Sequence, residues 1–196
     1  MDLYDRQKRY YDQRAGEYDA TAWDVLEQVE PEEVEHLVRA LAELGPAKTL
    51  DVACGTGFLS QHLPGDLTLL DASAAMLAHA SARVPRADTV QADALPLPFA
   101  NGSIERVISG HFYDHLQPAE RARFLADARR VGDEIVLVQE SGEEHREGLT
   151  RRDLRDGSRH EIYKALFTPE SLLDELGGGD VLHSGSLFVA VRRIWP

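Results

Sequence analysis

A glycine-rich turn stands between an apolar run and the segment that follows it. Residues 50–57 read LDVACGTG, so the run ends in Gly55 and Gly57. Because glycine has no Cβ, the backbone can bend sharply there and let a ligand approach closely. Ligands of parallel α/β sheets bind beyond the carboxyl ends of the strands. Taken alone, such a glycine pair also fits an ordinary turn between a strand and a helix.

Three acidic residues stand at or beside the ends of successive predicted strands. Asp51 lies next to the glycine turn, Asp71 follows the apolar run 67–70, and Asp93 follows the short run 89–91. A carboxylate at the second strand end can accept hydrogen bonds from both hydroxyls of a ribose. Each such charge-assisted bond contributes about 1.5–3 kcal/mol. The glycine turn and the acids together favour a ribose-containing ligand at one edge of a sheet.

The rest of the chain alternates between predicted strands and helices, as a sheet of this kind requires. Predicted strands cover residues 49–53, 67–71, 89–91, 104–109 and 134–139. Predicted helices cover residues 4–18, 31–44, 58–63, 73–82, 118–130 and 169–176. Strands 181–184 and 187–194 are too closely joined for a parallel crossover, so they should be antiparallel. The fold class expected is therefore α/β, a doubly wound and mostly parallel sheet.

Composition and charge narrow the classes of function. The 196 residues suit one domain, 1–196, and the net charge of −13 repels phosphate backbones, which disfavours a nucleic-acid substrate. Cys54 is the one cysteine, which excludes an intramolecular disulfide, and no metal-ligand spacing occurs, so no metal is expected. Without a signal peptide or an apolar run near 18 residues, we expect a cytoplasmic location and no membrane span.

Five segments carry a resemblance to a known family. LDVACGTG, LTLLDASAAML, VQADALPLPF, VISGHFYDHL and the opening YYDQRAGEYD occur in order across nearly the whole chain. The chain resembles the class I S-adenosylmethionine-dependent methyltransferases of the compact small-molecule type, which include quinone C-methyltransferases and antibiotic-tailoring enzymes. Ala53 departs from the pattern where a glycine is commonest, and Ser60 breaks the G-x-G-x-x-G fingerprint of dinucleotide oxidoreductases.

The resemblance implies a Rossmann-like, seven-stranded sheet with an antiparallel C-terminal strand, a helical cap over residues 1–45 and a flap over 145–167. It implies S-adenosylmethionine as cofactor and S-adenosylhomocysteine as product. Asp51 would hold the methionine amino group, Asp71 the ribose and Asp93 the adenine amine. The other cofactor contacts it implies are Ala53, Gly55 and Gly57 in the loop, Ala72, Met76 and Ala94 near the adenine, Ser109 and Gly110 near the methionine part, and Tyr11 and Arg14 from the N-terminal helix.

The catalytic candidates follow the fourth predicted strand. Methyl transfer needs alignment at about 3 Å and exclusion of water, and it needs a base only when the acceptor must lose a proton. His111 is the preferred base, since histidine titrates near pH 6.5, although a steric wall of the pocket is an equal alternative. Tyr113 and His115 are further catalytic candidates that also fit packing roles. Asp114 stands in the same cluster.

The acceptor is expected to contact His111, Glu140, Tyr163 and Phe167, with Lys164 as a neighbour. Glu140 follows the fifth strand, and an Asp-Gly turn within residues 154–158 predicts a hairpin in the flap. Capping by Glu140 and simple packing of Tyr163 and Phe167 are the alternatives.

Methylation of O, N or C in a small molecule, by a monomer or homodimer, is the leading interpretation of the whole sequence. Methylation of a protein or nucleic acid, a non-catalytic cofactor-binding module, and cyclisation or aminopropyl transfer from the sulfonium remain alternatives.

Overall fold

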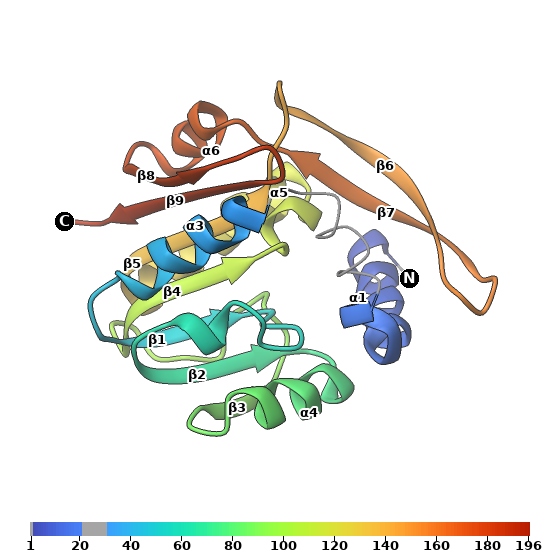
Figure 1. Ribbon diagram of the computed structural model, residues 1–196, viewed down its shortest axis with the longest axis horizontal. Coiled ribbons are helices and arrows are strands. Elements are labelled where there is room, and N and C mark those ends of the chain that lie inside the picture. The colour runs from blue at the N-terminus through green and yellow to red at the C-terminus, as the bar shows by residue number, and fades with distance from the viewer. Residues whose placement is uncertain (1, 21–30) are drawn as a thin grey trace.

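A seven-stranded sheet forms the centre of the computed structural model, which describes residues 2–20 and 31–196 (Figure 1). The strand order is β3-β2-β1-β4-β5-β9-β8. Its strands are β1 (Ala47–Val52), β2 (Gly65–Asp71), β3 (Asp88–Gln91), β4 (Ile104–Gly110), β5 (Gly132–Glu140), β8 (Asp180–Ser184) and β9 (Phe188–Ile194).

The strand directions confirm the predicted sheet. β1 pairs in parallel with β2 and β4, β2 with β3, and β4 with β5. β9 runs antiparallel to both β5 and β8. The short connection at Gly185 requires this direction for β8 and β9. The chain leaves β1 on one side for β2 and returns on the other side to β4, so a crevice opens beyond the carboxyl ends of these strands.

Helices cover both faces of the sheet and bury its apolar side chains. On one face, α5 (Pro118–Val131) and α6 (Pro169–Leu176) pack Phe124 and Leu172 against strand residues such as Val107. On the other face, α3 (Pro31–Ala42) and α4 (Ala74–Arg83) pack Leu41 and Leu77 against the sheet. Each helix thus turns an apolar stripe toward the sheet.

Local signals explain where several helices begin and end. The Ser73 hydroxyl accepts a hydrogen bond from the Met76 N–H at 3.2 Å and caps α4, as predicted. The predicted helix 58–63 is wrong, because the structure has only a 3₁₀ turn, η2 (Ser60–His62). Pro64 disfavours helical backbone before it, and the few residues after Gly57 are too short to nucleate a helix.

The N-terminal helix and a β-hairpin lie at the end of the molecule toward which β2 and β4 point (Figure 1). α1 (Leu3–Arg14) is shorter than the predicted helix 4–18 and continues as a 3₁₀ turn, η1 (Ala15–Glu17), around the flexible Gly16. Residues 21–30 of the predicted cap lie outside the described residues. None of the helices in the described ranges is long and apolar enough to cross a membrane.

The hairpin forms a separate two-stranded sheet of β6 (Arg146–Asp153) and β7 (Arg159–Leu166). Its turn contains the predicted Asp-Gly pair, with Gly157 at φ 85°. Arg121 of α5 holds the base of the hairpin, since its buried guanidinium lies 2.8 Å from Glu147 of β6 and 2.9 Å from Glu175 of α6. The ion pairs fix the hairpin relative to the core.

Candidate active site

Two adjoining cavities lie beyond the carboxyl ends of β1, β2 and β4. The first, of about 600 Å³, is bounded by the glycine loop, the start of α4 and α1. The second, of about 570 Å³, is bounded by the glycine loop, the hairpin and the turn before β9. Seven residues line both cavities and form what we call the shared wall: Tyr11, Tyr18, Ala53, Gly55, Gly110, His111 and His115. Both volumes fall in the range of small-molecule sites.

The glycine loop bends away from β1 as predicted. Gly55 lies at φ 54° and donates its N–H to the Asp71 carboxylate at 2.9 Å, and a Cβ added there would meet open space. Gly57 has a different role, because a Cβ there would lie 3.3 Å from Ala80 of α4. Gly55 therefore leaves room for a ligand, while Gly57 lets the loop pack closely on the helix.

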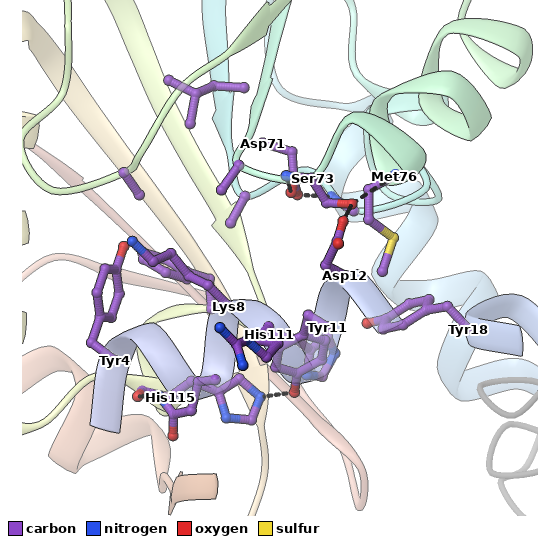
Figure 2. A pocket seen from close by; sticks show the side chains of 18 of the residues that line it. Tyr4, Lys8, Tyr11, Asp12, Tyr18, Asp71, Ser73, Met76, His111 and His115 are labelled. Carbon is purple, nitrogen blue, oxygen red and sulfur yellow. Dashed lines mark hydrogen bonds between the residues drawn. The ribbon is translucent and has the colours of Figure 1, made fainter. Parts of the chain in front are cut away.

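Asp71 borders the first cavity at the end of β2, beside Ser73 and Met76 (Figure 2). Its carboxylate accepts backbone N–H groups from Gly55 and Ser73, both at 2.9 Å. Burial raises the pKa of Asp71, although these backbone donors oppose the shift. The Ala72 N–H is a third backbone donor. An ionised carboxylate offers about four lone-pair sites, so one remains for a hydroxyl group of a ligand. Asp71 thus fits the predicted contact with a ribose.

Asp51 lies deeper, against the second cavity. Its side chain accepts a hydrogen bond from the Ser60 hydroxyl, and the residue is 3% exposed. Burial raises the pKa of Asp51 to about 7, the charge of Asp71 adds to the rise, and the Ser60 donor opposes it. Such a carboxylate gains from a nearby cation, as the ammonium group of an amino acid would be.

Asp93 is bound by two side chains of the N-terminal helix. The Tyr4 hydroxyl and the Lys8 ammonium, both from α1, donate to its two oxygens at 2.6 Å. Both partners line the first cavity, as do Gln91 and Ala94 on either side of Asp93. Asp93 therefore anchors α1 at this cavity, and its contact with the adenine amine stays a prediction.

α1 contributes more residues to the first cavity than the resemblance implied. Tyr4, Gln7, Lys8 and Asp12 line the first cavity together with the predicted Tyr11. Asp12 accepts a hydrogen bond from the Ser73 hydroxyl at 2.6 Å, so α1 spans the cavity from β3 to α4 (Figure 2). Their spacing in the sequence could have predicted this, because side chains three or four positions apart share one helix face.

The shared wall includes two non-glycine residues with left-handed backbone. Ala53, after β1, lies at φ 56°, and His111, after β4, lies at φ 53°. The His111 N–H donates to the Val138 carbonyl at 2.9 Å, and its ring centroid lies 5.3 Å from that of Phe188. Left-handed backbone at such residues costs of order 1–2 kcal/mol and concentrates at functional sites. His111 Nδ1 lies 3.8 Å from Asp114.

His115 is buried in the same wall and has a partner at each ring nitrogen. The Tyr11 hydroxyl lies 2.5 Å from Nε2, and the Tyr163 carbonyl lies 2.8 Å from Nδ1 (Figure 2). Burial lowers the pKa of His115 to about 4. The negative charge of Asp114 opposes this shift, but Lys164 offsets that charge. The imidazole is therefore neutral at pH 7.

A buried lysine separates two carboxylates on the far side of the second cavity. Lys164 of β7 lies 2.5 Å from Asp114 and 3.0 Å from Glu140. Both carboxylates raise its pKa, which overcomes the effect of burial, so Lys164 stays charged. Lys164 and Glu140 line the cavity and offer one positive and one negative group to an acceptor.

Four predicted site residues are buried and line neither cavity in the part of the chain that the structure describes. The Tyr113 hydroxyl donates to Glu175, and its ring packs against Phe167 at 6.0 Å between centroids. The Ser109 hydroxyl donates to the Val52 carbonyl at 2.9 Å. Tyr163 contributes its backbone to the His115 contact. These contacts fit packing roles for Tyr113, Ser109, Tyr163 and Phe167, and their predicted roles in the site stay predictions.

The remaining predicted residues do border the cavities. Ala72, Met76 and Gly110 line the first cavity, and Arg14 lines the second, 4.7 Å above the ring centroid of Tyr18. A Cβ at Gly110 would lie 2.4 Å from the Leu59 Cδ1, so a larger residue there would require the Leu59 side chain to move. Within residues 2–20 and 31–196, no group of three His, Cys, Asp or Glu side chains is arranged to hold a metal ion.

Comparisons with known proteins agree with this geometry. A family model described as "Methyltransferase domain" matches residues 49–133. The demethylmenaquinone methyltransferase of Thermotoga maritima is 28% identical over 128 residues, which cover 63% of this chain and 55% of that protein. The match therefore spans just over half the length of that curated relative.

Solved structures resemble the chain over a greater length. The DhpI–SAH complex is 26% identical with a TM-score of 0.80, over 99% of this chain and 98% of that one. The DhpI–SAM–HEP complex gives a TM-score of 0.81 over 97% of both chains at 26% identity. The 1,6-didemethyltoxoflavin-N1-methyltransferase of Burkholderia thailandensis, at 14% identity, shares the fold with a TM-score of 0.66 over 100% of this chain and 92% of that one.

The methyltransferase-domain match covers the strands that build the edge of both cavities, and the likeness to DhpI extends over nearly the whole chain. Residues 49–133 thus match a methyltransferase domain, and nearly the whole chain resembles a structure solved in complex with SAH.

Proposed function

We propose that this protein transfers a methyl group from S-adenosylmethionine to a small molecule. The observation that carries the proposal is the pair of cavities that meet at one shared wall. The first cavity, beside Asp71 and the glycine loop, holds the cofactor, and the second holds the acceptor. The similarity to methyltransferases supports the reaction, and the moderate volume of the second cavity supports a small acceptor.

The residues of the first cavity, together with Asp51 of the second, fit a cofactor whose methionine part passes the glycine loop. Asp71 has a lone pair left for a ribose hydroxyl, and the buried Asp51 favours the ammonium group of the methionine part. Gly55 leaves room for close approach. When bound, S-adenosylmethionine supplies a methyl group that its positive sulfur has already activated.

The shared wall places His111 between the two cavities. Its imidazole borders both, and Asp114 lies 3.8 Å from Nδ1. We assign His111 as the group that takes up the proton released by the acceptor. The hairpin and α1 border the outer sides of the cavities, where they would limit the access of water to the reacting atoms.

Calorimetry with S-adenosylhomocysteine tests the cofactor assignment through Asp71→Asn. The amide keeps one oxygen for a backbone N–H but loses the charge, so the Kd should rise about tenfold to a hundredfold. Asp66→Asn is the matched control, because Asp66 is exposed at the opposite end of the same strand and its replacement should leave the Kd unchanged. A folded Asp71→Asn protein with wild-type affinity would refute the ribose contact.

A further inference from the structure

A hydrogen-bond chain in the shared wall has a fixed direction. The Tyr163 carbonyl, 2.8 Å from His115 Nδ1, can only accept a hydrogen bond, so Nδ1 carries the ring proton. In a neutral imidazole the other nitrogen is then an acceptor. Tyr11, 2.5 Å from Nε2, therefore donates its hydroxyl proton to His115.

The surroundings of His115 keep the imidazole neutral. Asp114 approaches Nε2 at 3.5 Å and favours the charged ring, but Lys164 lies 2.5 Å from the same carboxylate and offsets it. His111, on the other side of Asp114, also disfavours a second positive charge. With burial as the largest cause, the pKa of His115 falls to about 4. The direction of the hydrogen bonds from Tyr11 through His115 to the Tyr163 carbonyl is thus the same throughout the neutral pH range.

Tyr11 consequently presents only lone pairs to a ligand. Its one proton is committed to His115, and the residue borders both cavities. Burial raises the pKa of Tyr11 well above 10, whereas that of His115 lies at about 4, so the proton stays on the tyrosine oxygen. The pair is therefore unsuited to act as a base and suited to recognise a hydrogen-bond donor.

We propose that Tyr11 selects acceptors whose reacting atom is a hydroxyl oxygen or an N–H nitrogen, and that His115 is the positioning residue that aims the Tyr11 lone pairs. The inference rests on the proposed function, because it takes the second cavity as the acceptor site. An acceptor that offers only lone pairs, such as a carboxylate or a thiolate, would meet the lone pairs of the Tyr11 oxygen with no proton between them and be repelled. A carbon nucleophile offers it no hydrogen bond of comparable strength.

The reaction balances with the residues of the wall. The acceptor oxygen or nitrogen forms a bond to the methyl carbon while the methyl–sulfur bond breaks and its electron pair stays on sulfur. The acceptor proton passes to the imidazole of His111, and Tyr11 keeps its own proton. Tyr11 thus orients the reacting atom, and His111 receives the proton.

The first test reads the hydrogen-bond direction without any acceptor. Nitrogen NMR of the full-length protein should show His115 as the Nδ1–H tautomer at pH 7. Tyr11→Phe should move the Nε2 resonance and leave the Nδ1 resonance nearly unchanged, because only one partner is removed. An Nε2–H tautomer in the wild-type protein would overturn the inference.

The second test identifies the bond that is formed. A metabolite extract is incubated with the enzyme and methyl-labelled S-adenosylmethionine, and the labelled product is characterised by NMR. A methyl ether or an N-methyl group supports the proposal, and a methyl ester, thioether or C-methyl product overturns it. Such an overturning product would leave the proposed function intact, whereas failure of wild-type protein to bind S-adenosylhomocysteine would refute the proposed function itself.

Variants separate recognition from a structural role. With the labelled acceptor in hand, Tyr11→Phe should raise KM about tenfold while the Kd for S-adenosylhomocysteine stays within about twofold. His115→Gln should restore most of the activity that His115→Leu loses, because a Gln side chain can accept from Tyr11 and donate to the Tyr163 carbonyl. Equal losses in the Gln and Leu variants would contradict the positioning role.

Discussion

The pH dependence of cofactor binding should report on Asp51. Its carboxyl is 3% exposed, and burial raises its pKa to about 7, with the charge of Asp71 adding to the rise. The proposed partner is the ammonium group of the cofactor, which attracts the carboxyl only in its ionised form. We therefore expect affinity for S-adenosylhomocysteine to fall as acidification protonates Asp51.

The size of the effect follows from the pKa. At a pKa of about 7, the ionised fraction of Asp51 is about 0.9 at pH 8 and about 0.1 at pH 6. A bound ammonium favours the ionised carboxyl, so the pKa in the complex lies below that in the free protein, and binding releases a proton between the two values. The Kd should accordingly rise about tenfold from pH 8 to pH 6.

Calorimetry at several pH values, in buffers of different ionisation enthalpy, measures both the affinity and the proton released. Asp51→Asn is the reference, because its profile contains every other titrating group but not this carboxyl. Ser60→Ala should move the midpoint to higher pH, since the Ser60 hydroxyl donates to the Asp51 carboxylate and stabilises its ionised form. If wild type and Asp51→Asn show the same pH profile, the reasoning is refuted.

The same pKa predicts an effect on folding. The carboxyl has its ordinary pKa of 3.8 when unfolded and about 7 when folded. Its contribution to stability is thus fully present below pH 3.8 and is lost as the pH rises through 7. At pH 8 the ionised group costs on the order of 4 kcal/mol. Urea denaturation should find Asp51→Asn more stable than wild type at pH 8, by a margin that shrinks at pH 5.

Two further predictions concern the wall and the hairpin. His111→Asn should lower kcat about a hundredfold and leave the affinity for S-adenosylhomocysteine within about twofold, because Asn tolerates the left-handed backbone but cannot take up a proton. Full turnover by this variant would remove His111 from the mechanism. The control is His79→Asn, since His79 is exposed. Arg121→Ala should reduce the free energy of unfolding by about 3 kcal/mol, because Glu147 and Glu175 lose their shared partner. Urea denaturation measures this against the exposed Arg129→Ala, and equal stability of the two variants would contradict the assignment.

Patterns local in sequence predicted most of the fold. Apolar runs that alternate with helical segments predicted the parallel strands, and the short link at Gly185 predicted that β8 and β9 are antiparallel. Ser73 at a helix start and the Asp-Gly turn were equally local signals. The failure at residues 58–63 also has a local cause, because Pro64 and the short length outweigh the apolar pattern.

The site depended on contacts that no local pattern encodes. The sequence placed Asp93 at a strand end, yet Lys8, 85 residues away, holds its carboxylate. Tyr113 stands in the predicted catalytic cluster, but its hydroxyl donates to Glu175 of a later helix. Only the packing of α1 and α6 on the sheet decides whether such a side chain borders a cavity or is bound elsewhere.

Most residues of the shared wall were predicted as site residues, but the left-handed backbone at two of them was not. Ala53 and His111 follow adjacent parallel strands, and each takes a backbone conformation that glycine would adopt more easily. The neighbouring backbone holds them there, because the Cys54 N–H donates to Leu70 at 3.0 Å and the His111 N–H donates to Val138 at 2.9 Å. Both hydrogen bonds reach across to neighbouring strands, so the conformation is determined by sheet pairing. The direction of the His111 side chain, and with it the proposed path of the proton, is therefore a property of the assembled sheet.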